Sequence, residues 1–316
     1  MIYTLTLNPA VDRELTVPEI IYDDVLRACA TRVDWGGKGF NVSRALAAWG
    51  EATVALGFVG GPTGQRIAAG LSELGIHTDF VQVAGETRTN VSIVSQSQRH
   101  HIKVNEPGPA ITPADEAALL AKVRALAAAG DWWVLSGSIP PGASATIYAR
   151  VTQAVEAAGA GVALDTSGDP LRHGCLAGPF LAKPNAAEAA ELVGRPVASP
   201  DDACAVVESI HALGVVNLLI SLGRRGAVLS DGAHCWLARP PQIVERNPVG
   251  AGDAMLAGLV WKLSHGASWP EALRWGVASG AATASLDGTA VGSYEQVEAL
   301  AGQVELEHLP GPARPG

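Results

Sequence analysis

The chain has 316 residues and a mass of 32.4 kDa, enough for two ordinary domains or one large α/β domain with an insertion. Its net charge of −9 and its pI near 5.4 argue against nucleic acid and anionic membranes as partners, because both select basic surfaces. Hydrophobic residues make up 48 %, but no uninterrupted apolar run approaches a membrane span, so we expect a soluble globular protein.

The start of the chain predicts a cytoplasmic location. The residues MIYTLTLNPA alternate like a β-strand and lack the basic start of a signal or transit peptide. The four cysteines are far apart and form no C-x-x-C pair, which is typical of a reducing compartment and argues against a structural zinc site: Cys29, Cys175, Cys204 and Cys235.

The first third of the chain mixes two patterns. Residues 11–35 and 88–106 show the period-two alternation of half-exposed strands, whereas GGKGFNVSRALAAWG, ATVALGFVG and GQRIAAGLSELG between them alternate as strand and helix. We therefore expect the two half-exposed segments to form a small β-sheet, a lid inserted in an α/β core. That core would consist of residues 1–10, 36–87 and 107–316.

From residue 107 onward, short apolar strands alternate with Ala-rich helices. This pattern is typical of β-α-β units and predicts a doubly wound, mostly parallel sheet covered by helices on both faces. Ligands of such folds collect beyond the carboxyl ends of the strands, where this chain has SGSIPPG, DTSGDP, KPNAAE and SLGRRG. The Pro/Gly-rich end, LPGPARPG, is predicted to be disordered.

The stretch NPVGAGDAMLAG carries the clearest chemical signal. Gly250, Ala251 and Gly252 leave the backbone unobstructed at a helix start, where N–H groups and the helix dipole favour an anion. Asp253 follows them, and two interpretations remain open. Its carboxylate could cap the helix, or it could be a general base that takes a hydroxyl proton beside an oxyanion hole.

Three further stretches are weaker by themselves. In KPNAAE, a helix starting near Pro184 would place Asn185 and Glu188 on one face, which suits Mg²⁺ but also helix capping. SLGRRGA at 221–227 suits a nucleotide phosphate or a plain β-turn. WGGKGFNVSRALAAWG at 35–50 is neither a P-loop nor a full dinucleotide-binding fingerprint, and forms a sugar-binding turn or only a tight strand-to-helix turn.

Taken in this order, these stretches resemble the ribokinase/PfkB family of carbohydrate kinases. GGKGFNVSRA is similar to the N-terminal signature of that family, and NPVGAGDAMLAGLV is similar to its C-terminal signature. TLTLNPAVD, GETRTN, SGSIPPG, KPNAAE and SLGRRGA resemble its phosphosugar branch. The resemblance spans nearly the whole chain and implies a ribokinase-like fold.

The resemblance also implies roles for individual residues. Asp253 would be the catalytic base, with the amides of Gly250, Ala251 and Gly252 as the anion hole. Asn185 and Glu188 would hold Mg²⁺, partly through water. The ATP site would comprise Lys183, Asn185, Ser221, Gly223, Gly226, Gly250 and Gly252. The sugar phosphate would be bound by Asp12, Gly37, Lys38, Asn41 and Arg88, with Arg27 as a lid arginine.

The activity implied is ATP- and Mg²⁺-dependent phosphoryl transfer to a sugar phosphate, with fructose 1-phosphate favoured and tagatose 6-phosphate as the alternative. Fructose 6-phosphate, an unphosphorylated sugar or nucleoside, or sugar binding without catalysis come after these. A requirement for a monovalent cation stays open. The resemblance and the open edges of the small sheet predict a homodimer joined through the lid.

Overall fold

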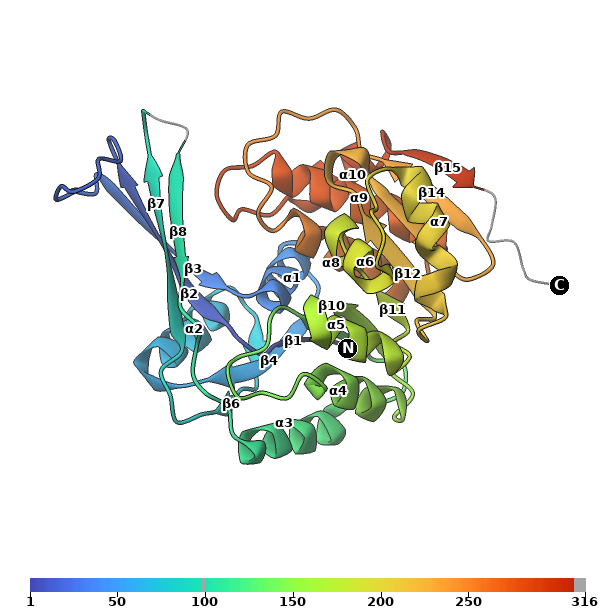
Figure 1. The fold of residues 1–316 in the computed structure, drawn as a ribbon, viewed down its shortest axis with the longest axis horizontal. Helices are drawn as coiled ribbons and strands as arrows, with labels where there is room; N and C mark the ends of the chain where they lie inside the picture. Colours follow the sequence, from blue (N-terminus) through green and yellow to red (C-terminus); the bar gives the residue numbers. More distant parts are fainter. Residues whose placement is uncertain (98–99, 310–316) are drawn as a thin grey trace.

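The computed structural model describes residues 1–97 and 100–309 and contains a large and a small β-sheet (Figure 1). Of the tail predicted to be disordered, Leu309 belongs to the last strand, and residues 310–316 lie outside the described residues. In spatial order, the large sheet consists of β15 (Glu305–Leu309), β14 (Cys235–Arg239), β13 (Ala227–Ser230), β12 (Asn217–Ser221), β11 (Leu181–Ala182), β10 (Gly161–Asp165), β9 (Trp132–Ser136), β1 (Ile2–Thr6), β4 (Thr53–Val59) and β5 (His77–Thr78), with β6 (Val81–Gln82) also paired to β4. The strands from β12 to β5 are parallel, and β13, β14 and β15 are antiparallel.

Helices cover both faces of the large sheet, which confirms the predicted doubly wound α/β fold. One face packs on α3 (Pro113–Leu126), α4 (Ile147–Glu156), α5 (Gly168–Leu176), α6 (Ala186–Val193) and α7 (Pro200–His211). The other packs on α1 (Lys38–Ala48), α2 (Gly61–Glu73), α8 (Ala251–Ser264), α9 (Trp269–Ala284) and α10 (Tyr294–Ala301). Within the described ranges, no helix combines the length and the apolar character needed to cross a bilayer.

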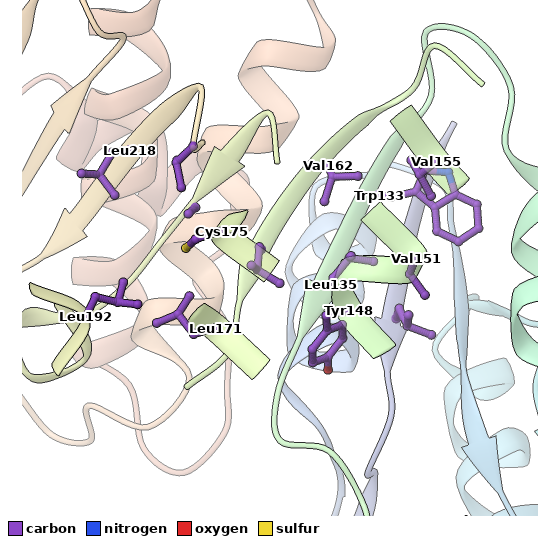
Figure 2. Packing of buried hydrophobic residues seen from close by; sticks show 14 of the residues in the cluster. Trp133, Leu135, Tyr148, Val151, Val155, Val162, Leu171, Cys175, Leu192 and Leu218 are labelled. Atoms are coloured by element: carbon purple, nitrogen blue, oxygen red, sulfur yellow. The ribbon is translucent and has the colours of Figure 1, made fainter. Parts of the chain in front are cut away.

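The core on the first face is built around the central strands (Figure 2). Trp133 and Leu135 project from β9 toward Tyr148 and Val151 of α4, and all four are fully buried. The hydroxyl of Tyr148 donates to the backbone oxygens of Ser136 and Gly137 at 3.1 and 3.0 Å. This buried side chain therefore supports the turn in which the central strand ends.

The small sheet stands off the core, as the sequence predicted. Its order is β3 (Ala30–Gly36), β2 (Ala10–Val17), β7 (Arg88–Ser95) and β8 (His101–Asn105). The two predicted segments meet because β2 and β7 pair in parallel over eight residues. In the first segment, β2 begins at Ala10 and β3 ends at Gly36, each one residue outside the predicted bounds of 11–35.

The two faces of the small sheet have different partners. The outer face includes Val11 and Trp35, which pack with Ile67 and Leu71 of α2. The inner face carries the alternate residues, among them Asp12, Glu14, Arg32, Asp34, Arg88, Asn90 and Lys103. Trp35 thus anchors the sheet on the core while polar residues line its opposite face.

Gly70→Ala tests this anchor. Alanine in a helix interior is normally more stable than glycine by about 0.5–1 kcal/mol, but a Cβ at position 70 would overlap the indole of Trp35. We expect a loss of about 1–3 kcal/mol in urea unfolding, as for other overpacked sites. Gly302→Ala at the end of α10, where the nearest atom to a new Cβ is 3.8 Å away, is the control and should cause no loss. Equal stability of both variants would contradict the anchoring role.

Candidate active site

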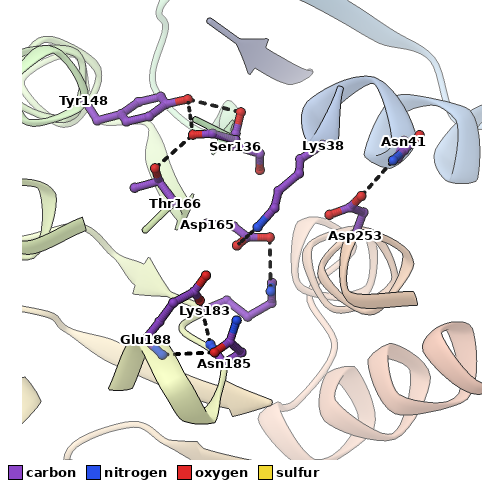
Figure 3. A network of polar contacts seen from close by, with 11 residues as sticks. Lys38, Asn41, Ser136, Tyr148, Asp165, Thr166, Lys183, Asn185, Glu188 and Asp253 are labelled. Atoms are coloured by element: carbon purple, nitrogen blue, oxygen red, sulfur yellow. Dashed lines mark hydrogen bonds and ion pairs between the residues drawn. The ribbon is translucent and has the colours of Figure 1, made fainter. Parts of the chain in front are cut away.

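Side chains from distant segments meet beyond the carboxyl ends of the parallel strands (Figure 3). At their centre Asp165, the last residue of β10, is 1 % exposed. Its Oδ1 accepts from Nζ of Lys38 at 2.9 Å, and its Oδ2 lies 3.0 Å from Nζ of Lys183. Two cations therefore share one carboxylate, so the cluster has a surplus positive charge that favours an anionic ligand.

Lys38 and Asp165 shift each other's pKa values. Burial alone would raise the pKa of Asp165, but the charges of Lys183 and Lys38 outweigh it and hold that pKa below its usual value. Burial would lower the pKa of Lys38, but Asp165 and Asp253 raise it overall. Lys38 and Asp165 therefore remain charged at neutral pH.

Asp253 lies in the first turn of α8, yet it does not cap that helix. The start of α8 has no side-chain capping bond, and Oδ2 of Asp253 instead accepts from Nδ2 of Asn41 at 2.8 Å. The carboxylate is 6 % exposed. Burial and the nearby charge of Asp165 raise its pKa to about 6. Of the two interpretations left open by the sequence, this geometry favours the general base.

The start of α8 forms the predicted anion-binding end. Gly250 precedes the helix with φ +83°, a left-handed conformation that glycine adopts readily. A Cβ at Gly252 would lie 3.6 Å from Nζ of Lys183, so the ammonium group lies beside the first turn. The helix dipole, the N–H groups of Gly250 and Gly252 and the ammonium of Lys183 act in the same place, beside Asp253. The N–H of Ala251, predicted to join them, instead donates to the oxygen of Pro248 at 3.2 Å.

Asn185 and Glu188 form a capping box, which is one of the alternatives that the sequence left open. Helix α6 begins at Ala186 and not near Pro184, so Asn185 is its N-cap. Asn185 Oδ1 accepts from the N–H groups of Ala187 and Glu188, and Glu188 Oε2 accepts from the N–H of Asn185 at 2.8 Å. Glu188 Oε1 has no hydrogen bond within the described part of the chain, and the Glu188 charge acts on Lys38.

The predicted nucleotide turn follows β12. Ser221 forms an isolated parallel β-bridge with Asn185, and its N–H donates to the oxygen of Pro184 at 3.0 Å. The structure therefore brings the SLGRRGA and KPNAAE segments together. A Cβ on Gly223 would meet open space, whereas one on Gly226 would overlap the carbonyl of Ala238. Gly226 is therefore required by packing, and Gly223 is the more accessible of the two.

Five of the predicted sugar-phosphate residues lie on the inner face of the small sheet or at the start of α1: Asp12, Arg88, Gly37, Lys38 and Asn41. Gly37 precedes α1, next to Lys38, and Asp12 Oδ1 accepts from Nδ2 of Asn90 at 2.7 Å. Arg88 donates to the backbone oxygens of Asn8 and Glu106 at 2.9 and 3.0 Å.

Three buried polar atoms in this region have no hydrogen-bond partner among the described residues: Asn8 Oδ1, Arg88 Nε and Asn90 Oδ1. Buried unpaired groups are costly, so a polar ligand is a reasonable partner for them.

Arg27 is separated from the other candidates. It is exposed in the connection between β2 and β3, beyond the Thr16–Ala30 pair that ends their ladder. Asp12 lies near the opposite end of that ladder. Within one chain, the structure does not bring Arg27 to the cluster around Asp165.

The main residue that sequence reasoning missed is Asp165. It lies in DTSGDP, one of the loops where chemistry was expected, and an aspartate directly after a buried strand was the available signal. Ser136, which ends the neighbouring strand β9, was also missed, although its Oγ is buried without a partner among the described residues.

Comparison with known proteins places the chain among carbohydrate kinases. The sequence profile of the pfkB family carbohydrate kinases matches residues 5–296. A 1-phosphofructokinase of Rhodobacter capsulatus is 37 % identical over 310 residues, covering 98 % of both chains, and one of Bacillus subtilis is 36 % identical over 309 residues, covering 98 % of this chain and 100 % of the relative. Phosphofructokinase-2 of Escherichia coli, solved in complex with potassium, aligns with a TM-score of 0.91 at 31 % identity, covering 96 % of this chain and 98 % of that one.

Asp253→Asn should stabilise the protein at pH 8. Folding raises the pKa of Asp253 from 3.8 to about 6, so the folded state loses stability as pH rises through that window. Asparagine avoids the buried charge, which predicts a gain of about 1–3 kcal/mol in urea unfolding at pH 8. The gain should shrink as pH falls from 6 toward 4.

The matched control is Asp115→Asn, because Asp115 holds the equivalent third position of α3 and does form a capping box. That variant should lose stability at pH 8. A similar loss for Asp253→Asn would restore the helix-cap interpretation.

Proposed function

This chain belongs to the pfkB family of carbohydrate kinases, and we propose that it transfers the γ-phosphoryl group of ATP to a hydroxyl group of fructose 1-phosphate. The observation that carries the proposal is the meeting, at the start of α8, of a buried carboxylate with a raised pKa and a lysine-rich anion site. The choice of fructose 1-phosphate rests on the names of the relatives.

We assign proton transfer to Asp253. Its carboxylate accepts the proton of the acceptor hydroxyl as that oxygen bonds to the γ-phosphorus and the bond to the leaving ADP oxygen breaks. Asn41 holds the carboxylate through its bond to Oδ2. The N–H groups of Gly250 and Gly252 and the ammonium of Lys183 stabilise the charge that develops on the phosphoryl oxygens.

We propose Mg²⁺ as the metal that accompanies ATP. Mg²⁺ keeps most of its waters and takes few protein ligands, which fits a single free oxygen such as Oε1 of Glu188. Asn185 Oδ1 already caps α6, so its part would be to hold Glu188 in place. Bound Mg²⁺ would neutralise phosphate charge during transfer. A monovalent cation is a further candidate, because the E. coli structure contains potassium.

The small sheet is proposed to be the lid over the sugar phosphate. Its inner face carries Asp12 and Arg88 opposite α1, which carries Lys38 and Asn41. All four cysteines are free thiols, which supports a proposed cytoplasmic location.

A coupled assay with a panel of acceptors tests this function. We expect the highest kcat/KM for fructose 1-phosphate, ahead of tagatose 6-phosphate, fructose 6-phosphate and free fructose. Asp253→Asn should lower kcat by about 10²–10⁴-fold, because general-base catalysis is lost. Arg88→Ala should raise KM for the sugar phosphate by about 10–100-fold and KM for ATP by less than about threefold, since only one substrate loses a charge-assisted bond.

Arg66→Ala, which removes an exposed cation from α2, is the control and should leave both KM values unchanged. Because Arg88 also bonds two backbone oxygens, thermal unfolding of its variant is recorded alongside. Equal losses for ATP and sugar phosphate, or efficient turnover of free fructose, would rule out a phosphosugar kinase.

We further propose a homodimer joined through the outer face of the small sheet. Beyond the part of this face that α2 covers, one row of cross-strand neighbours takes one residue from each strand. These are Val33, Arg13, Val91 and Val104. Val104 is 60 % exposed and Val33 is 37 % exposed. An apolar face on a small sheet with two open edges is suited to pairing with a second copy.

Val104→Glu should convert the dimer to a monomer in sedimentation at micromolar concentration, because it places a charge in the apolar row. Lys103→Glu is the matched control: it changes the neighbouring residue of β8, whose side chain is on the inner face, and should leave the dimer intact. A wild-type monomer, or a dimer that both variants keep, would contradict this interface.

A further inference from the structure

Residues 286–290, which follow α9 and lead toward α10, contact three segments far away in the sequence; we call them the strap. Asp287 accepts from Nη1 of Arg246 at 2.7 Å, and the carbonyl of Gly288 accepts from Nδ2 of Asn247 at 2.7 Å. The carbonyl of Thr289 accepts from Nη2 of Arg44 at 3.1 Å. The strap therefore joins α1, which carries Lys38 and Asn41, to the segment that enters α8.

Asn247 uses both ends of its side chain. While Nδ2 holds the strap, Oδ1 accepts from the N–H of Val249 at 3.0 Å. Val249 directly precedes Gly250, and the next turn is closed by the N–H of Ala251, which donates to the oxygen of Pro248 at 3.2 Å. The side chain of Asn247 thereby fixes the backbone from which the N–H groups of the anion hole project.

The small sheet reaches the strap through Arg32. Gly288 has φ +66°, and a Cβ at this position would overlap the guanidinium group of Arg32. Asp34 and Glu14, both on the inner face of the sheet, hold that group at 2.8 and 3.3 Å. The strap thus rests against a cation whose position is set by the sheet.

Resting on the function proposed above, we infer that Asn247 is a positioning residue that couples the anion hole to the small sheet through the strap. The route is contiguous: Arg32 packs on Gly288, Gly288 bonds Asn247, and Asn247 bonds Val249. With the sheet in place, the N–H donors of Gly250 and Gly252 are held in the direction that phosphoryl transfer needs.

The chemical consequence is control over when ATP can react. A misplacement of about 1 Å in such donors can cost roughly 10²-fold in rate. If the sheet swings away before a sugar phosphate is bound, the strap loses the support of Arg32 and the anion hole relaxes. ATP is then protected from attack by water in the absence of an acceptor.

A double-mutant cycle tests the coupling. Asn247→Ala should lower kcat by about 100-fold and Arg32→Ala by about tenfold, with KM for ATP changed by less than about threefold. The double variant should be no slower than Asn247→Ala alone, since both changes break one route. Lys103→Ala is the control, because it removes a cation from the same cross-strand row of the inner face as Arg32. The effects of Lys103→Ala and Asn247→Ala on kcat should multiply in the double variant.

Hydrogen exchange provides a readout that does not depend on turnover. With a sugar phosphate bound, which holds the sheet against the strap, Arg32→Ala should speed exchange of the amides from Val249 to Asp253 by at least about tenfold, whereas Lys103→Ala should not. The coupling would be overturned if the kcat losses of Asn247→Ala and Arg32→Ala multiplied in the double variant, or if Arg32→Ala left amide exchange unchanged. A wild type without activity on fructose 1-phosphate would instead contradict the proposed substrate, and exchange would still decide the role of the strap.

Discussion

The active site depends on one buried carboxylate, that of Asp165, shared between two lysines. Burying a single charge is costly unless it is paired, and here the pairing joins α1 to the residues that follow β11. The two lysines carry one positive charge more than Asp165, and their charges also act on Asp253 at the start of α8. An acidic chain, with a net charge of −9, thereby presents a local cation where anionic phosphates would bind.

Asp165 also determines what its neighbour Asp253 can do. The two carboxyl groups are both buried, but their pKa values move in opposite directions, because the lysines pair with Asp165 while Asp253 has only an amide partner. When the pKa values of two carboxyl groups move apart in this way, one site can hold both a permanent anion and a base that titrates near neutral pH. This difference supports the proposed roles, in which Asp165 holds the site together and Asp253 takes the proton.

The sequence predicted most of the fold because the spacing of the apolar residues in each helix or strand shows which of its faces is buried. It could not predict the cluster around Asp165, because the ion pair with Lys38 joins residues 127 positions apart. The capping box of Asn185 and Glu188 was foreseeable from N-x-x-E spacing, yet the same spacing also suited a metal, and only the position of the helix start separated the two. Local motifs thus indicated which residues could carry the chemistry, but not which distant residues those would contact.

The small sheet shows why partners matter. Alternation along β2 and β3 predicts two faces, but not that Trp35 packs on α2 while Arg32, three residues earlier, touches the strap. Because successive side chains point to opposite faces, one movement of the sheet would alter both contacts together. A sheet that covers the sugar phosphate can then also act on the anion hole, so substrate binding and activation of ATP need not be separate events.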